Sequence, residues 1–326
     1  MKALFFDTQL ALREVDTLRP AAGEALIRVT LAGICGTDRQ ILKGYSGFRG
    51  IPGHEFVGQV VECEERDWIG KRVVGEINVT CGRCDFCSRG LGRHCRDRSV
   101  MGIVNRPGAF AEYVTLPFAN LHEVPASVSD EAAVFTEPLA AAAEILEQMP
   151  VPTGTRVAVL GAGRLGLLVA QVLNHAGARV MVIGRGAGKL ELARSWGLST
   201  VNTVDAAASS LSARSFPMVV DATGAPSGLD EALRLVEPRG TVVMKSTFHG
   251  PAHFDTAKLV VDEITLLGSR CGNFATALHL LTTGAVRTRE LISKVVSLEA
   301  GVEAFNYLNA PSCLKVLLST GRQTGA

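Results

Sequence analysis

The chain has 326 residues, enough for two domains of ordinary size, and 47% of them are hydrophobic, which is ample for buried cores. It carries 33 basic and 32 acidic residues, and this near balance gives no sign of a nucleic-acid or membrane partner. Residues 1–15 include the early Asp7 and no long apolar run, so we expect no signal peptide. No window approaches the roughly 18 apolar residues of a membrane span, and we therefore expect a cytoplasmic protein.

The chain before Thr136 has the pattern of a mostly β domain. Residues 25–33 alternate apolar and polar side chains, which is the period of two expected for a half-buried strand. Residues 55–62 (EFVGQVVE) and 72–79 (RVVGEINV) are similar, and each is interrupted by a glycine. Strands with inserted glycines and short turns predict a barrel-like β domain.

Four cysteines lie within CGRCDFCSRGLGRHC, residues 81–95. Cytosolic thiols stay reduced, so such a cluster is more typical of a metal site than of disulfides. Four thiolates with no His or water form the closed, tetrahedral ligand set of structural zinc. Free cysteines in a loop and an iron–sulfur cluster are the alternatives, and we predict a structural zinc held by Cys81, Cys84, Cys87 and Cys95.

Beyond Thr136, helix and strand patterns alternate. A helix is predicted over 137–149, and further helices over 165–175, 189–196 and 229–235. Short apolar strands are predicted over 156–160, 179–183, 218–221, 241–245 and 264–269. This alternation predicts a parallel sheet with right-handed crossovers.

The first strand of this region runs into GAGRLG, which places Gly161, Gly163 and Gly166 in a G-x-G-x-x-G register. The motif follows a predicted strand and opens a predicted helix, which is the context that makes it specific for a dinucleotide. The glycines permit a tight turn, approach of a pyrophosphate and close packing of helix on strand. An ordinary β-turn-helix is the alternative. We assign the loop, with Arg164 and Leu165, to cofactor binding.

The end of the second strand decides between NAD and NADP. An Asp or Glu about 20 residues beyond the glycines would bind the ribose 2′-hydroxyl of NAD. Here Gly184 takes that position, Arg185 follows, and Lys189 lies four residues further on. Arg forms charge-assisted bonds with a 2′-phosphate, so we predict that NADP is preferred over NAD. A solvated Arg185 is the alternative.

Three further segments have ordinary explanations when each is taken alone. Cys35 in GICGTD is a candidate core residue, His54 in GHE a hydrogen-bonded histidine, and Glu137 in TEPL a helix cap. Together with the lobe, the glycine loop and DATG (Asp221–Gly224), they resemble the zinc-dependent medium-chain dehydrogenases, the alcohol and polyol dehydrogenase family. The motifs keep the family's order over essentially the whole chain, and EPL is similar to the sorbitol and glucose dehydrogenase-like branch.

The resemblance implies a fold and domain limits. We expect a Rossmann doubly wound parallel sheet, of class α/β, inserted in a GroES-like, mostly β catalytic domain. The catalytic domain would cover 1–138 with the zinc lobe 81–95, the Rossmann domain 139–270, and a return to the catalytic domain 271–326.

The resemblance also implies two zinc ions per chain, one structural and one catalytic. Cys35 and His54 would bind the catalytic ion with Glu137, while Glu55 would be a neighbouring or alternating ligand. Thr37 matches the family's hydroxyl relay residue, and Gln40 takes the place of a relay His that many relatives have.

Other residues complete the expected site. Asp38 is expected to orient His54 or neighbouring backbone. Thr223, Gly224 and Lys245 end central strands and are assigned to the cofactor; Arg270 follows another strand, with a surface salt bridge as the alternative. By resemblance, Lys315 would contact the pyrophosphate.

The expected reaction is hydride transfer between NADP(H) and a small alcohol or polyol, or its ketone or aldehyde. With one thiolate, one imidazole and one carboxylate as ligands, zinc keeps an open position for the substrate oxygen. A reductase acting on C=C or C=N bonds with a non-essential zinc is the alternative, and a non-catalytic nucleotide sensor is a third hypothesis. The resemblance favours a homodimer or homotetramer.

Overall fold

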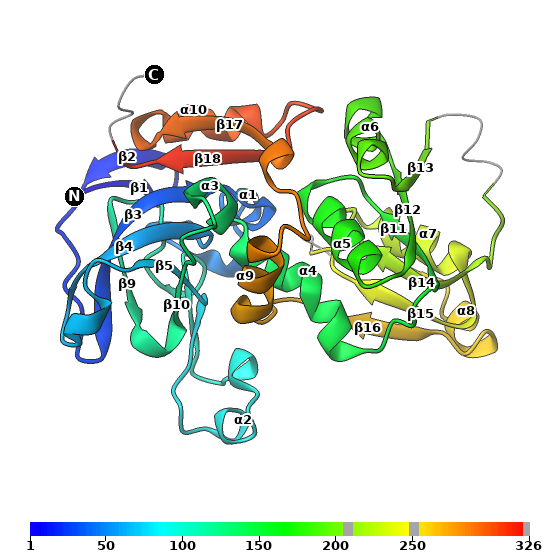
Figure 1. Cartoon of the computed structure of the whole chain (residues 1–326), viewed down its shortest axis with the longest axis horizontal. Helices are drawn as coiled ribbons and strands as arrows, with labels where there is room; N and C mark the ends of the chain where they lie inside the picture. The colour runs from blue at the N-terminus through cyan, green and yellow to red at the C-terminus, as the bar shows by residue number, and fades with distance from the viewer. Residues whose placement is uncertain (205–210, 248–253, 322–326) are drawn as a thin grey trace. The chain divides into compact units, whose positions relative to one another are not determined.

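The structure, a computed structural model, describes residues 1–204, 211–247 and 254–321. It divides the chain into two compact units (Figure 1). The catalytic unit comprises 1–137, 274–283 and 291–326, and the nucleotide unit comprises 138–273 and 284–290. We expected a single return segment, 271–326, whereas residues 284–290 group with the nucleotide unit.

The catalytic unit is mostly β. Its largest sheet has the order β10-β5-β4-β3-β18-β17, and β9 also pairs with β3. The strands of the unit are β1 (Lys2–Phe6), β2 (Leu10–Glu14), β3 (Glu24–Gly33), β4 (Phe56–Cys63), β5 (Arg72–Gly75), β6 (Asn78–Val79), β7 (Ser99–Met101), β8 (Asn105–Arg106), β9 (Tyr113–Pro117), β10 (Leu121–Glu123), β17 (Ile292–Ser297) and β18 (Lys315–Ser319). Its helices are α1 (Gly36–Ile41), α2 (Asp85–Ser88), α3 (Asp130–Ala133), α9 (Phe274–Thr282) and α10 (Gly301–Tyr307).

Strand β3 is the centre of this unit because its apolar side chains are buried: Ala25, Leu26, Ile27, Val29 and Leu31. The prediction that 72–79 forms one strand is wrong. The segment is split into β5, in the large sheet, and β6, which pairs with β7 in a separate three-stranded sheet. Gly75 ends β5, and a Cβ atom there would lie 2.3 Å from Cδ1 of Leu116, so only glycine fits without a shift of that side chain.

The nucleotide unit is a six-stranded parallel sheet in the order β13-β12-β11-β14-β15-β16. This is the doubly wound order: successive strands are added on one side of β11 and then, from β14 onward, on its other side. The strands are β11 (Arg156–Leu160), β12 (Arg179–Gly184), β13 (Ser199–Asn202), β14 (Phe216–Asp221), β15 (Val236–Met244) and β16 (Thr265–Gly268). The helices are α5 (Arg164–His175), α6 (Ala187–Ser195), α7 (Ser227–Leu235) and α8 (Thr256–Val261), and α4 (Thr136–Gln148) starts at the border of the two units.

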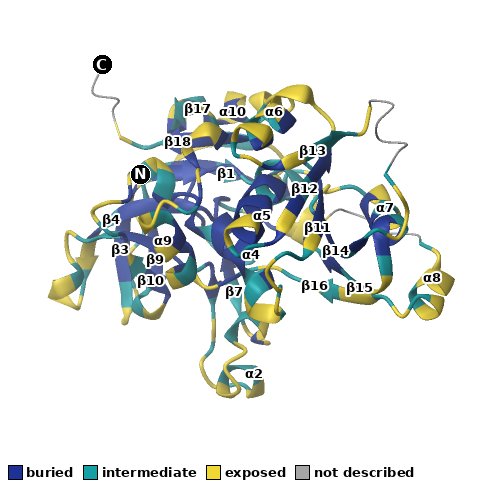
Figure 2. Cartoon of the chain, turned by 45° about the vertical axis from the view of Figure 1, so that its right-hand side comes forward, coloured by how far each residue is buried: buried dark blue, intermediate teal, exposed yellow. Residues whose placement is uncertain are grey.

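Burial explains why most strands of this unit could be predicted from their apolar runs. Four of the five residues of β11 are buried, since both faces of a parallel sheet are covered. Helix α5 is buried along most of its length, whereas α8 is exposed (Figure 2). The predicted fold class is therefore confirmed: a doubly wound sheet together with a mostly β unit. Among the described residues, no helix is long and apolar enough to cross a membrane.

Candidate active site and metal centres

The four cysteines of the lobe come together around one point. Their sulfur atoms all lie within 4.8 Å of one another, and the Sγ–Sγ distances are 3.5 Å for Cys84–Cys87 and Cys81–Cys95 and 3.8 Å for Cys84–Cys95. A disulfide needs about 2.05 Å, whereas tetrahedral zinc with Zn–S bonds of about 2.3 Å separates its sulfurs by about 3.8 Å. Backbone N–H groups of Arg96 and Cys87 lower the pKa of Cys84 to about 6, whereas burial and the neighbouring Cys84 and Cys95 raise the pKa of Cys87 to about 11. The sulfur geometry rather than these pKa values therefore carries the zinc assignment. The donor set fits zinc.

A second cluster forms where β3 ends. Atoms of Cys35, His54 and Glu55 lie within 4.8 Å of one another, although they come from separate segments. Cys35 is the N-cap of α1, and His54 and Glu55 precede β4, which pairs with β3. His54 and Glu55 are buried and Cys35 is partly buried. One thiolate, one imidazole and one carboxylate fit a zinc site with a position left for substrate.

Asp38 joins two of these groups. Its Oδ2 accepts a hydrogen bond from the backbone N–H of Cys35 at 2.7 Å, and its Oδ1 lies 3.2 Å from Nδ1 of His54. The hydrogen bond to Cys35 bears out the expected contact of Asp38 with neighbouring backbone, while its orienting role for His54 stays a prediction. Burial alone lowers the pKa of His54, but the charges of Asp38 and Cys35 raise it well above 6.5. The same negative surroundings favour a bound cation.

Glu55 has a second partner that the sequence did not indicate. Its Oε2 forms an ion pair with Nζ of Lys315, and both side chains are fully buried. Gly33 makes this approach possible, because a Cβ there would lie 2.5 Å from Cε of Lys315 and 2.7 Å from Oε2 of Glu55. Burial lowers the pKa of Lys315 to about 8, while the charges of Cys35 and Asp38 oppose the shift.

We expected Lys315 to contact the cofactor pyrophosphate, and that contact stays a prediction. Its ammonium group has no exposed surface and is used by Glu55, within the catalytic unit. Lys315 opens β18 and Glu55 directly precedes β4, and both strands pair with β3, so the fold joins residues that are 260 apart in sequence. No local motif reports such a pair.

Thr37 and Glu137 complete the set of predicted catalytic residues. Oγ1 of Thr37 lies 3.8 Å from Sγ of Cys35, so its hydroxyl is next to the candidate ligand set. Glu137 lies in the first turn of α4 and is partly buried. The cluster that the structure brings together contains Glu55 rather than Glu137. Glu137 as a ligand stays a prediction.

The glycine loop of the nucleotide unit has the shape of a phosphate cradle. Gly161 has φ 103°, and a Cβ there would lie 2.6 Å from the carbonyl oxygen of Ala222. A Cβ on Gly166 would overlap the carbonyl oxygen of Gly161, so helix α5 can approach only with glycine at this position. Gly163, the N-cap of α5, has no atom within 4 Å of such a Cβ. The space above Gly163 and the helix N-terminus fit the pyrophosphate of a dinucleotide, with Arg164 and Leu165 in the first turn.

The end of β12 carries the residues predicted to choose the cofactor. Gly184 packs on the loop, since a Cβ there would lie 2.9 Å from the backbone nitrogen of Ala162. Arg185 follows at once and is exposed, and Lys189 lies in α6, partly buried. Both cations are thus placed beyond the end of the strand next to β11, where the adenosine ribose of a dinucleotide binds.

The remaining predicted cofactor residues lie at the carboxyl ends of the next strands. The N–H and hydroxyl groups of Thr223 both donate to Oδ1 of Asp221, and the N–H of Gly224 donates to Oγ of Ser246 at 2.8 Å. Lys245 follows β15, and Arg270 lies two residues beyond β16. The nucleotide unit therefore brings all four predicted residues to one edge of its sheet.

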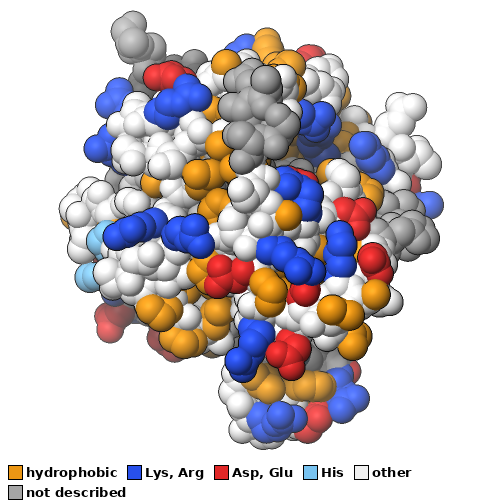
Figure 3. Space-filling model, turned by 90° about the vertical axis from the view of Figure 1, so that its right-hand side faces the viewer, with side chains coloured by type: hydrophobic (Ala, Val, Ile, Leu, Met, Phe, Trp, Pro, Cys, Tyr) orange, Lys and Arg blue, Asp and Glu red, His pale blue; other side chains and the backbone are white. Residues whose placement is uncertain are grey.

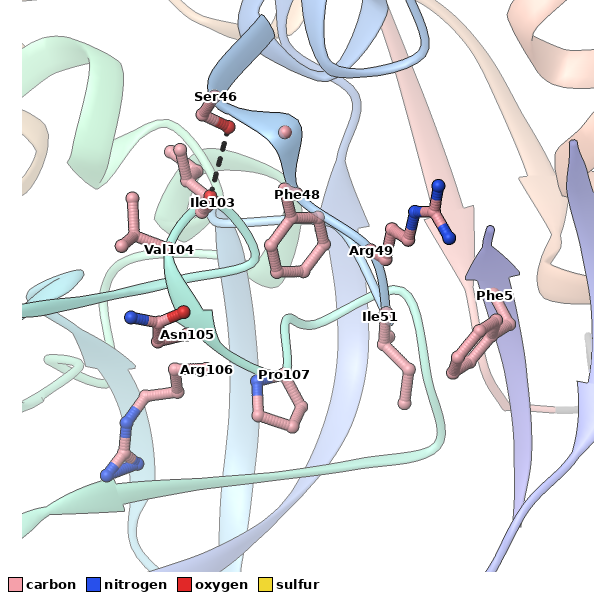
Figure 4. Close-up of a pocket in the computed structure, with 12 residues that line it drawn as sticks. Phe5, Ser46, Phe48, Arg49, Ile51, Ile103, Val104, Asn105, Arg106 and Pro107 are labelled. Atoms are coloured by element: carbon pink, nitrogen blue, oxygen red, sulfur yellow. Dashed lines mark hydrogen bonds between the residues drawn. The ribbon is translucent and has the colours of Figure 1, made fainter. Parts of the chain in front are cut away.

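One pocket of the catalytic unit lies apart from these groups. It has a volume of about 290 Å³ and is lined by Phe5 and by residues of the segments 46–51 and 103–107 (Figure 4). Ser46 closes one side by donating to the carbonyl oxygen of Ile103 at 3.2 Å, and Arg49 pairs with Asp7 at 3.3 Å. None of the predicted ligands or cofactor residues lines it. On the face shown in Figure 3, basic side chains are interspersed with acidic and apolar ones, as the net charge of +1 suggests.

Comparison with known proteins connects both units to one family. Residues 21–126 match the alcohol dehydrogenase GroES-like domain, and residues 165–283 match the zinc-binding dehydrogenase domain. D-arabinitol dehydrogenase 1 of Uromyces fabae is 30% identical over 90% of this chain and 89% of its own length. The chain belongs to the zinc-dependent medium-chain dehydrogenase/reductase family. The resemblance stated from the sequence is confirmed.

Other members of the family differ in substrate and cofactor. L-threonine 3-dehydrogenase of Streptomyces avermitilis is 36% identical over 79% of this chain and 80% of its own length. A zinc-binding dehydrogenase of Sinorhizobium meliloti 1021 bound to NADP superposes with a TM-score of 0.90 at 30% identity, covering 98% of both chains. The rspB alcohol dehydrogenase of Escherichia coli CFT073 complexed with NADH also superposes with a TM-score of 0.90, at 29% identity over 98% of this chain and 99% of that one.

Proposed function

We propose that this protein transfers a hydride between NADP(H) and a small alcohol or polyol, or the corresponding ketone or aldehyde, with the help of a bound zinc ion. The observation that carries the proposal is the cluster of Cys35, His54 and Glu55 within 4.8 Å, in a chain that also has a complete glycine loop. Relatives that are named for arabinitol and threonine as substrates support an alcohol rather than another donor.

Zinc bound here would supply Lewis-acid polarisation of the substrate oxygen. Cys35 and His54 would hold the ion, and Asp38, which contacts both residues, would keep them in place. Thr37, beside Cys35, donates a hydrogen bond to the substrate oxygen in one direction and receives its proton in the other. Gln40 cannot titrate, so the proton would pass from Oγ1 of Thr37 to the cofactor ribose, to water or to another residue rather than to a histidine at this position.

Glu55 would be the third protein ligand, and Glu137 would exchange with it. Membership of the cluster supports Glu55 as a ligand. Its ion pair with Lys315 already neutralises its charge, which supports exchange with Glu137. The zinc affinities of the Glu55→Gln and Glu137→Gln variants show which carboxylate binds the ion. They are measured by competition with a chromophoric chelator. An unchanged affinity in both variants would overturn the assignment.

NADP preference rests on Arg185, with Lys189 in support, at the end of β12. Arg185→Ala should lower the ratio of kcat/KM for NADP to that for NAD, because a guanidinium bonds a 2′-phosphate but has no equal partner in NAD. Arg194→Ala is the matched control, since this Arg pairs with Glu191 on the exposed surface of α6. If Arg185→Ala and the control give the same ratio as the unchanged protein, the preference has another origin.

The reaction is tested by initial rates of NADP⁺ and NAD⁺ reduction with polyols, aldoses and secondary alcohols, each with and without a zinc chelator. A chelator-sensitive rate supports the proposal. The missing relay histidine favours one second candidate, a reductase of C=C or C=N bonds that does not need the catalytic zinc. Cys35→Ser separates the two, because full activity in a folded variant would favour the reductase.

A homodimer or homotetramer is the assembly we infer. Within the described part of the chain, β16 is an edge strand of its sheet and has an exposed Leu266, and Val260 and Val261 of helix α8 are 77% and 76% exposed. Large apolar side chains at a free sheet edge favour pairing with a second copy. Light scattering on the unchanged protein and on a Val260→Lys, Val261→Lys variant tests this inference, and an unchanged mass in the variant would refute it.

A further inference from the structure

Phe135 lies beside the buried ion pair of Lys315 and Glu55. Its ring has no exposed surface, and it belongs to the catalytic unit, as do both members of the pair. Nζ of Lys315 lies 5.7 Å from the centroid of this ring, within the distance of about 6 Å over which an aromatic face attracts a cation. Two groups therefore hold the ammonium group, the carboxylate of Glu55 and the face of Phe135.

The ring and the ammonium group have little freedom to move apart. Phe135 lies in the short connection between α3 and α4, where its backbone N–H donates to the carbonyl oxygen of Ala132 at 3.0 Å. The stem of Lys315 passes Gly33 so closely that a Cβ there would lie 2.5 Å from its Cε atom. The structure thus keeps the ammonium group in one place while Glu55 stays with it.

Both groups that hold Lys315 oppose the binding of zinc by Glu55. Zinc on Glu55 would bring two positive charges next to the ammonium group, and like charges repel strongly in a buried site. The ammonium group would then have to withdraw, and it would lose both the carboxylate and the ring.

We propose that Phe135 is a positioning residue whose ring holds Lys315 on Glu55 and thereby restrains Glu55 from binding the catalytic zinc. The ring shifts the exchange between the two candidate carboxylate ligands away from Glu55. The inference rests on the proposed function, because it requires zinc at the cluster of Cys35, His54 and Glu55.

The experiment measures the zinc dissociation constant of the catalytic site at neutral pH, by competition with a chromophoric chelator. Phe135→Leu keeps an apolar side chain but removes the aromatic face, so zinc should bind about fivefold more tightly, as the loss of one buried cation–aromatic contact implies. In a Glu55→Gln background the same substitution should have no effect. Phe6→Leu is the matched control, because Phe6 is a buried ring of the same unit that packs in an apolar cluster with Ile41 and Phe48, and its loss should leave the zinc affinity unchanged.

A second change at the same position separates attraction of the cation from packing. A trifluorinated phenyl ring in place of the Phe135 ring has nearly the same size, but fluorine withdraws electron density from its face and weakens its attraction for a cation. This variant should also bind zinc more tightly than the unchanged protein. A purely structural role of Phe135 would leave its zinc affinity unchanged.

Three results would overturn the inference. The first is an unchanged or weaker zinc affinity in Phe135→Leu. The second is a gain in affinity that persists in the Glu55→Gln background, because the ring would then act on another group. The third is a gain in Phe135→Leu without one in the fluorinated variant, because packing would then be the cause. An unchanged protein that binds no zinc beyond the ion of the lobe would overturn the proposed function itself.

Discussion

The buried pair of Lys315 and Glu55 gives the sharpest test of how the catalytic unit balances its charges. Lys315→Met keeps a long unbranched side chain but removes the ammonium group, and Glu55 then remains in an interior site with no exposed surface. Removing one partner of a buried ion pair costs about 3–5 kcal/mol of stability. We expect this cost in zinc-free protein. With zinc bound, the ion beside Glu55 replaces part of the lost charge, and we expect the cost to fall by about 2 kcal/mol.

The two tryptophans allow each unit to be followed separately. Trp68 lies in the catalytic unit and Trp196 in the nucleotide unit, so a Trp196→Phe background leaves one reporter for the unit that contains Lys315. Urea unfolding of this background and of its Lys315→Met variant, each with zinc and after chelation, gives four free energies of unfolding. Lys2→Met is the matched control, because Lys2 pairs with Glu299 at 2.7 Å on an exposed surface.

Two results would refute this reasoning. One is an equal cost of Lys315→Met with and without zinc, since Glu55 would then not share its charge with the metal. The other is a cost no larger than that of Lys2→Met, since exposed pairs contribute little to stability and a buried pair should contribute more.

Three further predictions test the metal centres and the glycine loop. Cys84→Ser should lower the zinc content of the purified protein from two ions per chain to one, because only the structural site loses a ligand. Mass spectrometry measures the zinc content. Loss of both ions or of neither would contradict two independent sites. The free energy of unfolding of zinc-free protein should fall as the pH rises from 6.5 through the raised pKa of His54, because the folded state is stabilised only while His54 keeps its proton. Asp38→Asn should weaken this pH dependence, measured by urea titrations. An unchanged pH profile in the variant would contradict the prediction. Gly163→Ala should keep the melting temperature but weaken NADPH binding, whereas Gly166→Ala should lower the melting temperature, and equal effects of both would contradict the cradle geometry.

The fold could be predicted from the sequence because its signals are local. The strand predicted over 156–160 coincides with β11, and the helix predicted over 165–175 differs from α5 by one residue. The strand β13 was missed because its four residues, Ser199–Asn202, are exposed or only partly buried and have no apolar run. The segment 72–79 was read as one strand because periodicity does not report which sheet a strand joins.

In the candidate site, too, local sequence signals could be interpreted, whereas contacts between distant residues could not. The lobe cysteines lie within fifteen residues, so their spacing alone indicates that four sulfurs can meet. The contact of Lys315 with Glu55 was missed because it depends on the pairing of β18 with β3, which joins distant parts of the chain. Gly33 could not be recognised at all, since its role is to leave room for a contact between two other side chains.

Charge balance links these observations. In the ionised state that binds a metal, the cluster at the end of β3 holds three anions, the Cys35 thiolate and the carboxylates of Asp38 and Glu55, against the single ammonium group of Lys315. Buried charges persist only where they are compensated, and a dication supplies the two missing positive charges. Without the metal, a proton on His54 replaces part of that charge, which is the reason its pKa lies well above 6.5. A second carboxylate ligand from Glu137 would leave an excess anion, so the charges favour exchange of Glu137 with Glu55 over simultaneous binding.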